Sequence, residues 1–352
     1  MRIVAYTQRE SGVGYHRLFM PLAHMQDVKV HVTNLPTLES FNFNPDVIVY
    51  NRVTFFQDWN AYRAESSAKI VMDIDDGWIL PTNHINYAQY QFFRPIIENN
   101  LRHADCVTVT HERLAEQVWP FNQNIHILPN ALPYGRDQFV PDRVPDDKFR
   151  IFWAGSVTHN HDLAILRDPI KRLLPLADRV KFVMGGYVDS DPVSKQYWDG
   201  MLNSFTACRA MPHARIHATL PEDYYGMFAY ADAMVVPLED SPWHGLKSNL
   251  KLLEAAGKSI PVVCSHVAPY TYDADAPVLW AKNKADWFSH MKSLILDKSK
   301  RNEYGQALHT WAIERYNFDI INAERRELYR TLCGAPASDG TVYENGGNDN
   351  GA

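Results

Sequence analysis

Charged residues recur at helical spacing in the segment WHGLKSNLKLLEAAGKSIPVV, residues 243–263. Four of them are four, three and four positions apart: Lys247, Lys251, Glu254 and Lys258. An α-helix places residues at this spacing on one face. Lysines on that face could neutralise a diphosphate, and the glutamate could accept hydrogen bonds from sugar hydroxyls. The same spacing is also typical of an ordinary solvated helix face.

The neighbouring residues favour a binding segment. Leu246, Leu250 and Leu253 repeat the spacing one residue earlier and predict a buried face beside the charged one. Gly257 suits the position after a helix, where a left-handed backbone favours glycine. The apolar run IPVVC then predicts a buried strand. We therefore expect a helix and strand that together hold a sugar nucleotide.

Carboxylates cluster after another predicted strand, residues 70–74. The stretch KIVMDIDDGWILPTNH contains Asp73, Asp75 and Asp76. Asp75 or Asp76 could orient an acceptor hydroxyl or accept its proton, which makes them the candidate catalytic residues. Crowding raises the pKa of one carboxyl in such a group and helps it act as a base. Two other interpretations stay open: an acidic turn that caps the next element, and an Asp-x-Asp site for a divalent cation.

A glycine turn follows the first predicted strand. Gly12 and Gly14 lead into a helix, whose first N–H groups could hold a phosphate. Arg17 stands where a dinucleotide-binding G-x-G-x-x-G motif carries its third glycine, which counts against an oxidoreductase. Arg17 could itself reach a phosphate or carboxylate, or lie on a helix surface.

A second turn, at Gly155 and Ser156, follows the strand predicted at 151–153. The hydroxyls of Ser156 and Ser248 are candidate phosphate ligands, or caps of helices. His159 and His161 could contact donor phosphate or ribose, although loop histidines are more typically solvated. The histidine spacing matches no metal site.

The order of these motifs resembles that of glycosyltransferases with the GT-B fold, of the retaining family 4 or group 1 type, in a phage-like branch. The matching stretches are AYTQRESGVGYHRLFMPL, HILPNAL, IFWAGSVTHNHDLAIL and VVPLEDSPWHGLKSNLKLLEAAGKSIPVVCS. The resemblance implies two Rossmann-like α/β domains with parallel sheets facing across a cleft, a nucleoside diphosphate sugar as co-substrate and no essential metal. With the residue chemistry above, it makes these the candidate donor-binding residues: Gly12, Gly14, Arg17, Gly155, Ser156, Lys247, Ser248, Lys251 and Glu254.

Two positions depart from the family pattern. Many retaining members carry paired glutamates eight positions apart, and Glu254 matches the second while Leu246 stands at the first. Many members also carry a His-Asp pair at the end of the strand predicted at 70–74. Asp75 replaces that histidine and Asp76 matches the aspartate. These departures favour a divergent branch.

Several acceptors stay open. Resemblance to phage enzymes makes hydroxymethylated pyrimidines in DNA one candidate acceptor, beside glycans, lipid-linked sugars and proteins. A non-catalytic module that binds sugar nucleotides is another interpretation, as is an enzyme that cleaves or epimerises them without an acceptor. The net charge of −6 and the pI near 6.2 predict no general affinity for nucleic acid. A local basic cleft is still compatible with this overall charge.

Composition and length fit a two-domain globular enzyme. The 352 residues are 46% hydrophobic and 22% charged. No stretch reaches the roughly 18 apolar residues of a membrane span, and the N-terminus lacks a signal-peptide core, so we expect a cytoplasmic protein. Four scattered cysteines predict reduced thiols rather than a disulfide framework or metal site.

Predicted strands and helices alternate along the chain and predict two parallel α/β sheets. We expect an N-terminal acceptor-side domain over residues 1–140 and a nucleotide-sugar-binding domain over 141–310, joined by the Pro- and Asp-rich stretch 133–148. The resemblance implies that a helix over 311–333, the end of a long helical pattern from 301 to 329, packs back on the first domain. Residues 334–352 lack apolar periodicity and predict a disordered tail.

Overall fold

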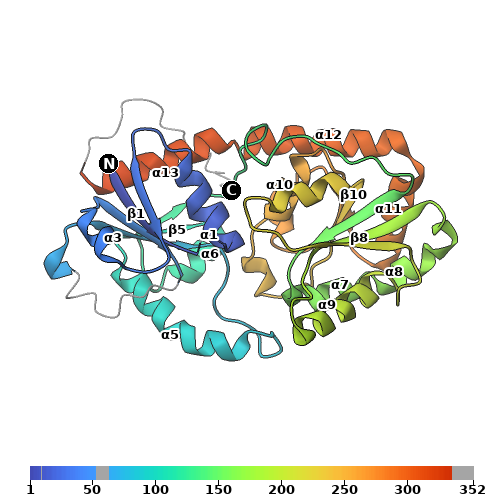
Figure 1. The fold of residues 1–352 in the computed structure, drawn as a ribbon, viewed down its shortest axis with the longest axis horizontal. Coiled ribbons are helices and arrows are strands. Elements are labelled where there is room, and N and C mark those ends of the chain that lie inside the picture. Colours follow the sequence, from blue (N-terminus) through green and yellow to red (C-terminus); the bar gives the residue numbers. More distant parts are fainter. Residues whose placement is uncertain (9, 53–62, 335–352) are drawn as a thin grey trace, which may run out of the picture.

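Two parallel sheets lie side by side in the computed structural model, which describes residues 1–8, 10–52 and 63–334 (Figure 1). Each sheet has six strands, in the orders β2-β1-β3-β4-β5-β6 and β12-β11-β10-β7-β8-β9. The strand pairs in both sheets are parallel. This two-domain α/β architecture confirms the predicted fold class.

The first sheet forms from the apolar runs that the sequence predicts as strands. Its strands are Arg2–Tyr6 (β1), Lys29–Thr33 (β2), Val47–Asn51 (β3), Lys69–Ile74 (β4), Cys106–Val109 (β5) and Ile125–Ile127 (β6). Alternate side chains of β1 enter opposite cores: Val4 and Tyr6 join one apolar cluster, and Ile3 and Ala5 join the other. Both faces of the central strands are therefore buried, which explains their continuous apolar sequences.

Helices cover both faces of this sheet. They are Gly12–Gly14 (α1), the π-helical turn Tyr15–Phe19 (η1), Met20–Ala23 (α2), Leu38–Asn42 (α3), Tyr87–His103 (α5) and Glu112–Val118 (α6). The first three run on without a break, and the Ser11 hydroxyl caps their start by accepting a hydrogen bond from the Gly14 N–H at 2.9 Å.

The second sheet repeats the plan. Its strands are Phe149–Ala154 (β7), Val180–Tyr187 (β8), His213–His217 (β9), Ala233–Val236 (β10), Val262–Ser265 (β11) and Leu279–Ala281 (β12). The helices around it are Asn160–Ala164 (α7), Arg167–Arg172 (α8), Pro192–Phe205 (α9), Leu250–Ala256 (α10) and Lys284–Leu296 (α11), with 3-10 turns at Val157–His159 (η2), Leu174–Leu176 (η3), Tyr224–Tyr230 (η4), His244–Leu246 (η5) and Tyr270–Asp273 (η6). The sequence did not predict β12, which is three residues long.

The long helical pattern predicted from 301 to 329 is two helices. Lys298–Arg315 (α12) ends before Asn317, whose side chain caps the next helix, Phe318–Leu332 (α13), by accepting from the N–H groups of Asp319 and Ile320. The prediction of one helix is wrong because apolar spacing alone does not register this cap.

The two helices pack on different domains. Leu308 and Ala312 of α12 join a core cluster of the second sheet, whereas Tyr329 of α13 joins a cluster of the first. The Asn322 side chain also donates a hydrogen bond to the Pro21 carbonyl at 2.9 Å. The C-terminal helices therefore run along both domains (Figure 1).

Three sequence expectations concern the rest of the chain. All four cysteines are unpaired. Within the described residues, every helix is too short or too polar to cross a membrane. The tail predicted to be disordered, 334–352, lies outside the described residues apart from Gly334.

Candidate functional site

Loops at the carboxyl ends of the two sheets meet between the domains. The loop after β4 carries Asp75 and Asp76, and η5 of the second domain packs against it. Gly77 marks the contact, because a Cβ there would lie 2.7 Å from Leu246 Cδ1. Leu246 itself packs against an apolar cluster of the first sheet. Ligands of open parallel sheets bind beyond these strand ends, so the candidate residues share one region.

The helix predicted in the segment 243–263 is shorter than its charge spacing suggests. Lys247 precedes α10 with an extended backbone, φ −76° and ψ 166°. Lys258 follows the helix, and its ammonium pairs with Asp142 and the Val140 carbonyl. Only Lys251 and Glu254 belong to the helix, so the prediction that four charged residues share one helical face is wrong.

Contacts between elements explain the shorter helix. Leu246 is drawn toward the core of the first domain, and the Asn249 side chain donates to Asp273 Oδ2 at 2.7 Å. These contacts hold the turn before α10 in a non-helical form, as tertiary context often overrides local propensity.

Gly257 is also needed for a reason other than the predicted one. Its backbone is right-handed, with φ −63°. A Cβ at this position would lie 2.2 Å from the Tyr225 hydroxyl and 2.8 Å from the Tyr134 ring. Close packing, rather than a left-handed turn, therefore requires glycine here.

Lys251 and Glu254 form an ion pair on α10, with side chains that are 24% and 3% exposed. The Lys251 ammonium donates to Glu254 Oε2 at 3.0 Å and to the Tyr224 hydroxyl at 3.1 Å. Burial works to lower the pKa of Lys251, but the Glu254 carboxylate and the Tyr224 hydroxyl outweigh it and hold that pKa above its ordinary value. Burial raises the pKa of Glu254, and Lys251 opposes this shift. Lys251 is thus a fixed cation at neutral pH.

Lys247 and Asp76 connect the domains. The Lys247 ammonium donates to Asp76 Oδ2 at 3.1 Å and lies 4.2 Å from the centre of the Trp243 ring. The other Asp76 oxygen accepts from the Gly77 N–H at 2.9 Å. The structure therefore brings a predicted donor-binding lysine and a predicted catalytic carboxylate into direct contact.

Asp75 is held by a residue that sequence reasoning missed. Arg52 donates to Asp75 Oδ1 from Nε at 2.9 Å and from its terminal nitrogen at 2.5 Å, and reaches the Tyr90 hydroxyl at 2.7 Å. Arg52 has a left-handed backbone, φ 30°. Arg52 therefore holds Asp75 within the first domain, whereas the partner of Asp76, Lys247, belongs to the other domain.

Arg17 lies in the interior of the first domain. Its residue is 1% exposed, and its guanidinium donates to both oxygens of Asp73, at 2.8 and 3.0 Å. It also donates to the Leu128 carbonyl at 2.8 Å and to Asn130 Oδ1 at 3.1 Å. Of the roles that the sequence left open, Arg17 contacts a carboxylate, and its hydrogen-bonding groups are satisfied inside the first domain, which counts against its predicted contact with the donor.

The contacts of Arg17 and Arg52 also bear on the Asp-x-Asp metal site, formed by Asp73 and Asp75. Asp73 is 1% exposed and additionally accepts from the Thr108 hydroxyl at 2.7 Å. Asp75 is bound by Arg52. Asp73 is thus bonded inside the domain and Asp75 is paired with an arginine, which counts against the Asp-x-Asp metal site left open by the sequence.

The two glycines of the first turn differ. A Cβ at Gly14 would lie 2.2 Å from the Gln8 carbonyl oxygen and 2.4 Å from Thr7 Oγ1, whereas nothing lies within 4 Å of a Cβ at Gly12. Gly14 permits the close packing of the helix start on β1. Gly12 is exposed and leaves open space at the helix N-terminus.

The second turn lies beside the same region. A Cβ at Gly155 would lie 2.6 Å from the Trp153 ring. Ser156 is exposed, and its hydroxyl shares a hydrogen bond of 2.7 Å with that of Thr158. Ser248 accepts from the Asn130 side chain at 2.8 Å, which ties the loop before α10 to the first domain.

A cavity of about 250 Å³ opens between the domains. Residues 81–85 of the first domain line one side, and residues between 157 and 162 and between 239 and 244 line the other. His161 lies in this lining and is exposed, while His159 shares a hydrogen bond of 2.7 Å with the buried Asp162. Burial lowers the pKa of His159 and of His244 in the same wall.

A second cavity, of about 500 Å³, lies in the first domain at the ends of β1 and β3. Neutral polar side chains and the rings of Tyr6 and Phe93 dominate its lining, which also includes Gln8, Asn34, Asn51, Gln89 and Arg52. The sequence did not reveal this cavity, because its residues are spread over four separate segments of the chain.

Sequence reasoning also missed His16. Its residue is 9% exposed and its Nδ1 is buried without a hydrogen-bond partner. Burial lowers the pKa of His16 to about 4, and the positive charges of Lys251 and Arg17 add to this effect. His16 directly precedes Arg17, so attention to the glycine turn alone could have found it.

No protein-family model and no curated protein matches the chain. Solved structures do match. A sucrose-phosphate synthase from Thermosynechococcus elongatus is 12% identical with a TM-score of 0.68, covering 95% of this chain and 99% of that one. Anabaena HepE in complex with UDP-glucose is 12% identical with a TM-score of 0.60, covering 94% and 100%. A glycosyltransferase from Rickettsia africae is 12% identical with a TM-score of 0.61, covering 94% and 98%. The chain therefore has the two-domain GT-B fold.

Proposed function

We propose that this chain is a glycosyltransferase that moves a sugar from a nucleoside diphosphate sugar to an acceptor hydroxyl. One observation carries the proposal: Lys247 contacts the Asp76 carboxylate between the two GT-B domains, and the Lys251 and Glu254 pair follows Lys247 on α10. Fixed cations on one side and a carboxylate on the other are what transfer from a diphosphate requires. The similar fold of a protein solved in complex with UDP-glucose supports a nucleoside diphosphate sugar as the donor.

The donor would bind along the second domain. Lys247 and Lys251 would neutralise the diphosphate, and Glu254 would accept hydrogen bonds from ribose or sugar hydroxyls. The exposed turn at Gly155 and Ser156, the Ser248 hydroxyl, and the open backbone at Gly12 and Gly14 would add contacts. Because lysines supply the positive charge, this step would need no essential metal.

In the transfer, the acceptor oxygen forms a bond to the anomeric carbon. The bond from that carbon to the phosphate oxygen breaks, and the nucleoside diphosphate leaves with the electron pair. Asp76 would accept the acceptor proton once phosphate draws Lys247 away from it. Asp75, held by Arg52, would position the acceptor instead.

Retention of the anomeric configuration rests on the resemblance to family 4 enzymes. The position that carries their first paired glutamate is Leu246, and it packs into the first domain. The protein therefore must handle the donor sugar without that carboxylate. Anomeric proton NMR of the product reports retention or inversion directly.

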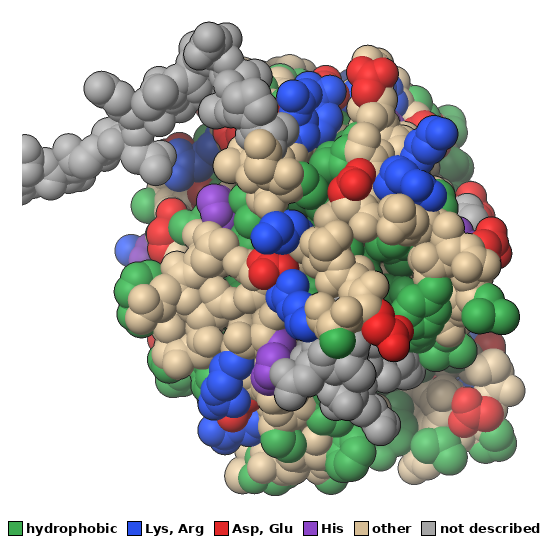
Figure 2. All heavy atoms as spheres, turned by 90° about the vertical axis from the view of Figure 1, so that its left-hand side faces the viewer, with side chains coloured by type: hydrophobic (Ala, Val, Ile, Leu, Met, Phe, Trp, Pro, Cys, Tyr) green, Lys and Arg blue, Asp and Glu red, His purple; other side chains and the backbone are tan. Residues whose placement is uncertain are grey.

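The lining of the larger cavity favours a carbohydrate acceptor. Amide side chains such as Asn34, Asn51 and Gln89 bond sugar hydroxyls well, and Phe93 offers an apolar face. Among the described lining residues, Arg52 is the cation, and it is already paired with Asp75. On the face of the first domain shown in Figure 2, basic and acidic side chains are interspersed. DNA binding draws on gathered basic charge, so hydroxymethylated DNA is the less favoured acceptor.

The test incubates the purified protein with a panel of nucleoside diphosphate sugars, with and without glycans or DNA containing hydroxymethylated pyrimidines. Mass spectrometry then reads the products, including the nucleosides of digested DNA. A hexose- or pentose-sized mass gain on a glycan supports the proposal and names the donor. The same gain on a pyrimidine assigns DNA as acceptor. Absence of turnover with every donor contradicts an enzyme and favours a module that only binds sugar nucleotides.

A further inference from the structure

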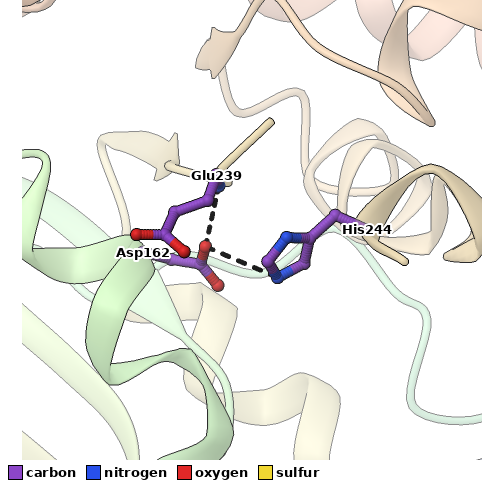
Figure 3. A group of neighbouring side chains, drawn as sticks. All are labelled: Asp162, Glu239 and His244. Carbon is purple, nitrogen blue, oxygen red and sulfur yellow. Dashed lines mark hydrogen bonds and ion pairs between the residues drawn. The ribbon is translucent and has the colours of Figure 1, made fainter. Parts of the chain in front are cut away.

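Three side chains from two segments of the second domain converge on one point in the wall of the interdomain cavity. Asp162 lies on α7, Glu239 follows β10, and His244 begins η5 (Figure 3). One ligand atom from each of the three lies within 4.8 Å of the others. Two ligands of one transition-metal ion lie at most roughly 4.4 Å apart, since each metal–ligand bond is about 2.0–2.2 Å. Rotation of the exposed Glu239 side chain closes this small difference.

His244 is oriented for such a role. It is 8% exposed, and its Nδ1 shares a hydrogen bond of 2.9 Å with the Ser241 hydroxyl. Its Nε2 points at Asp162 Oδ1 from 3.8 Å, too far for a hydrogen bond (Figure 3). A metal-binding histidine typically has one ring nitrogen fixed by a neighbour and the other directed at the ion.

Asp162 is supported in the same way. Its side chain is 2% exposed, Oδ2 shares a hydrogen bond of 2.7 Å with His159, and Oδ1 accepts from the Glu239 N–H at 2.8 Å. Among the described residues, its ion-pair partners are imidazoles, and neither a lysine nor an arginine pairs with it. A buried carboxylate is stabilised by a fixed positive charge, and a bound cation would supply one.

We propose that Asp162, Glu239 and His244 bind one divalent transition-metal ion of the Mn²⁺ or Zn²⁺ class. Two carboxylates and an imidazole suit these ions better than Mg²⁺ or Ca²⁺, which prefer oxygen ligands alone. The ligands are 77 and five positions apart in the chain, which is why their spacing gave no signal in the sequence. The ion ties α7 to the connection between β10 and α10 in the cavity wall and stabilises the folded protein.

The experiment measures binding of Mn²⁺ and Zn²⁺ to chelator-stripped protein by isothermal titration calorimetry, without a sugar nucleotide. Thermal unfolding with and without each ion accompanies it. Glu239→Gln and His244→Gln remove one ligand each, and Asp240→Asn is the matched control, because Asp240 is an exposed carboxylate next to Glu239. Because Glu239 is exposed, we expect Glu239→Gln to fold normally, so that its metal binding can be measured.

We expect one ion per chain with at least one of the two metals, and a rise in the midpoint of thermal unfolding. Glu239→Gln and His244→Gln should weaken binding by roughly 10- to 100-fold, the loss seen when supporting residues of metal sites are removed. Asp240→Asn should bind like the unsubstituted protein. Failure of both metals to bind, or equal binding by Glu239→Gln and Asp240→Asn, overturns the proposal. Neither readout depends on glycosyl transfer.

Discussion

Lys247 Nζ lies 3.1 Å from Asp76 Oδ2, and this ion pair joins the loop before α10 to the end of β4 across the interdomain cleft. Both side chains are partly buried, at 17% and 21% exposed. A diphosphate that binds Lys247 must compete with Asp76. Donor binding at Lys247 would therefore release the Asp76 carboxylate from this ion pair.

Substitutions of the two partners should change nucleotide affinity in opposite directions. Asp76→Asn removes the competitor for Lys247, so the affinity for UDP should rise about threefold, the value of a partly exposed ion pair. Its rate of sugar transfer should fall by about 100-fold or more, because the base is lost. Lys247→Ala should instead weaken UDP binding. Calorimetry measures the UDP affinity of both variants. A lower affinity for Asp76→Asn would argue against competition between Asp76 and the diphosphate for Lys247.

Arg17→Leu should unfold the first domain more easily rather than weaken donor binding. The substitution leaves the Asp73 carboxylate buried without its partner, which costs about 3–5 kcal/mol of the free energy of unfolding. Urea titration measures this loss. The KM for the donor in the fraction that stays folded should match that of the unsubstituted protein. A raised donor KM with unchanged stability would restore Arg17 to the binding site.

Gly257→Ala and Gly12→Ala form a matched pair. The Cβ of Gly257→Ala meets the Tyr225 hydroxyl and the Tyr134 ring, so the free energy of unfolding should fall by about 1–3 kcal/mol. The Cβ of Gly12→Ala would lie in open space at a helix start, so the free energy of unfolding should change by less than about 1 kcal/mol. Equal effects of the two substitutions in thermal or urea unfolding would show that packing at Gly257 does not require glycine.

His16 should make stability depend on pH. Its pKa is about 4 in the folded protein, below the ordinary value of 6.5, because burial and the charges of Lys251 and Arg17 disfavour the proton. The unfolded chain then binds a proton that the folded chain does not. The contribution of neutral His16 is complete above pH 6.5 and is lost as the pH falls toward 4.

The variant His16→Gln isolates this effect. From pH 7 to pH 5 the free energy of unfolding should fall about 2 kcal/mol more in the unsubstituted protein than in His16→Gln. Urea unfolding at the two pH values gives the difference. Parallel pH dependence in both proteins would mean that His16 takes up its proton equally in the folded and unfolded states.

The strands and the two-sheet architecture could be predicted because central parallel strands are buried on both faces. Residues 3–6 of β1 and 233–236 of β10 are apolar, and such an apolar run can be read locally in the sequence. The three-residue β12 carries too little of it. The break before α13 depends on a single capping residue, Asn317, which apolar spacing does not reveal.

The site was harder to predict because its contacts join distant segments. Arg17 and Asp73 are 56 positions apart, and nothing in the glycine turn shows that the arginine points inward. Lys247 leaves the helix because Leu246 packs on the other domain. Lys251 and Glu254 keep their helical spacing, so their pairing could be inferred from the sequence alone.

The most direct test of the account is the release of nucleoside diphosphate from a panel of sugar nucleotides, compared between the unsubstituted protein, Lys251→Ala and Lys298→Ala. Lys251 is partly buried and paired with Glu254, whereas Lys298 is an exposed lysine at the start of α12. We predict turnover of at least one donor that falls by about 100-fold or more in Lys251→Ala, as expected when a group stabilising the leaving charge is lost. Lys298→Ala should keep full turnover. Turnover that survives in Lys251→Ala, with its folded state verified by circular dichroism, would contradict the proposed donor site.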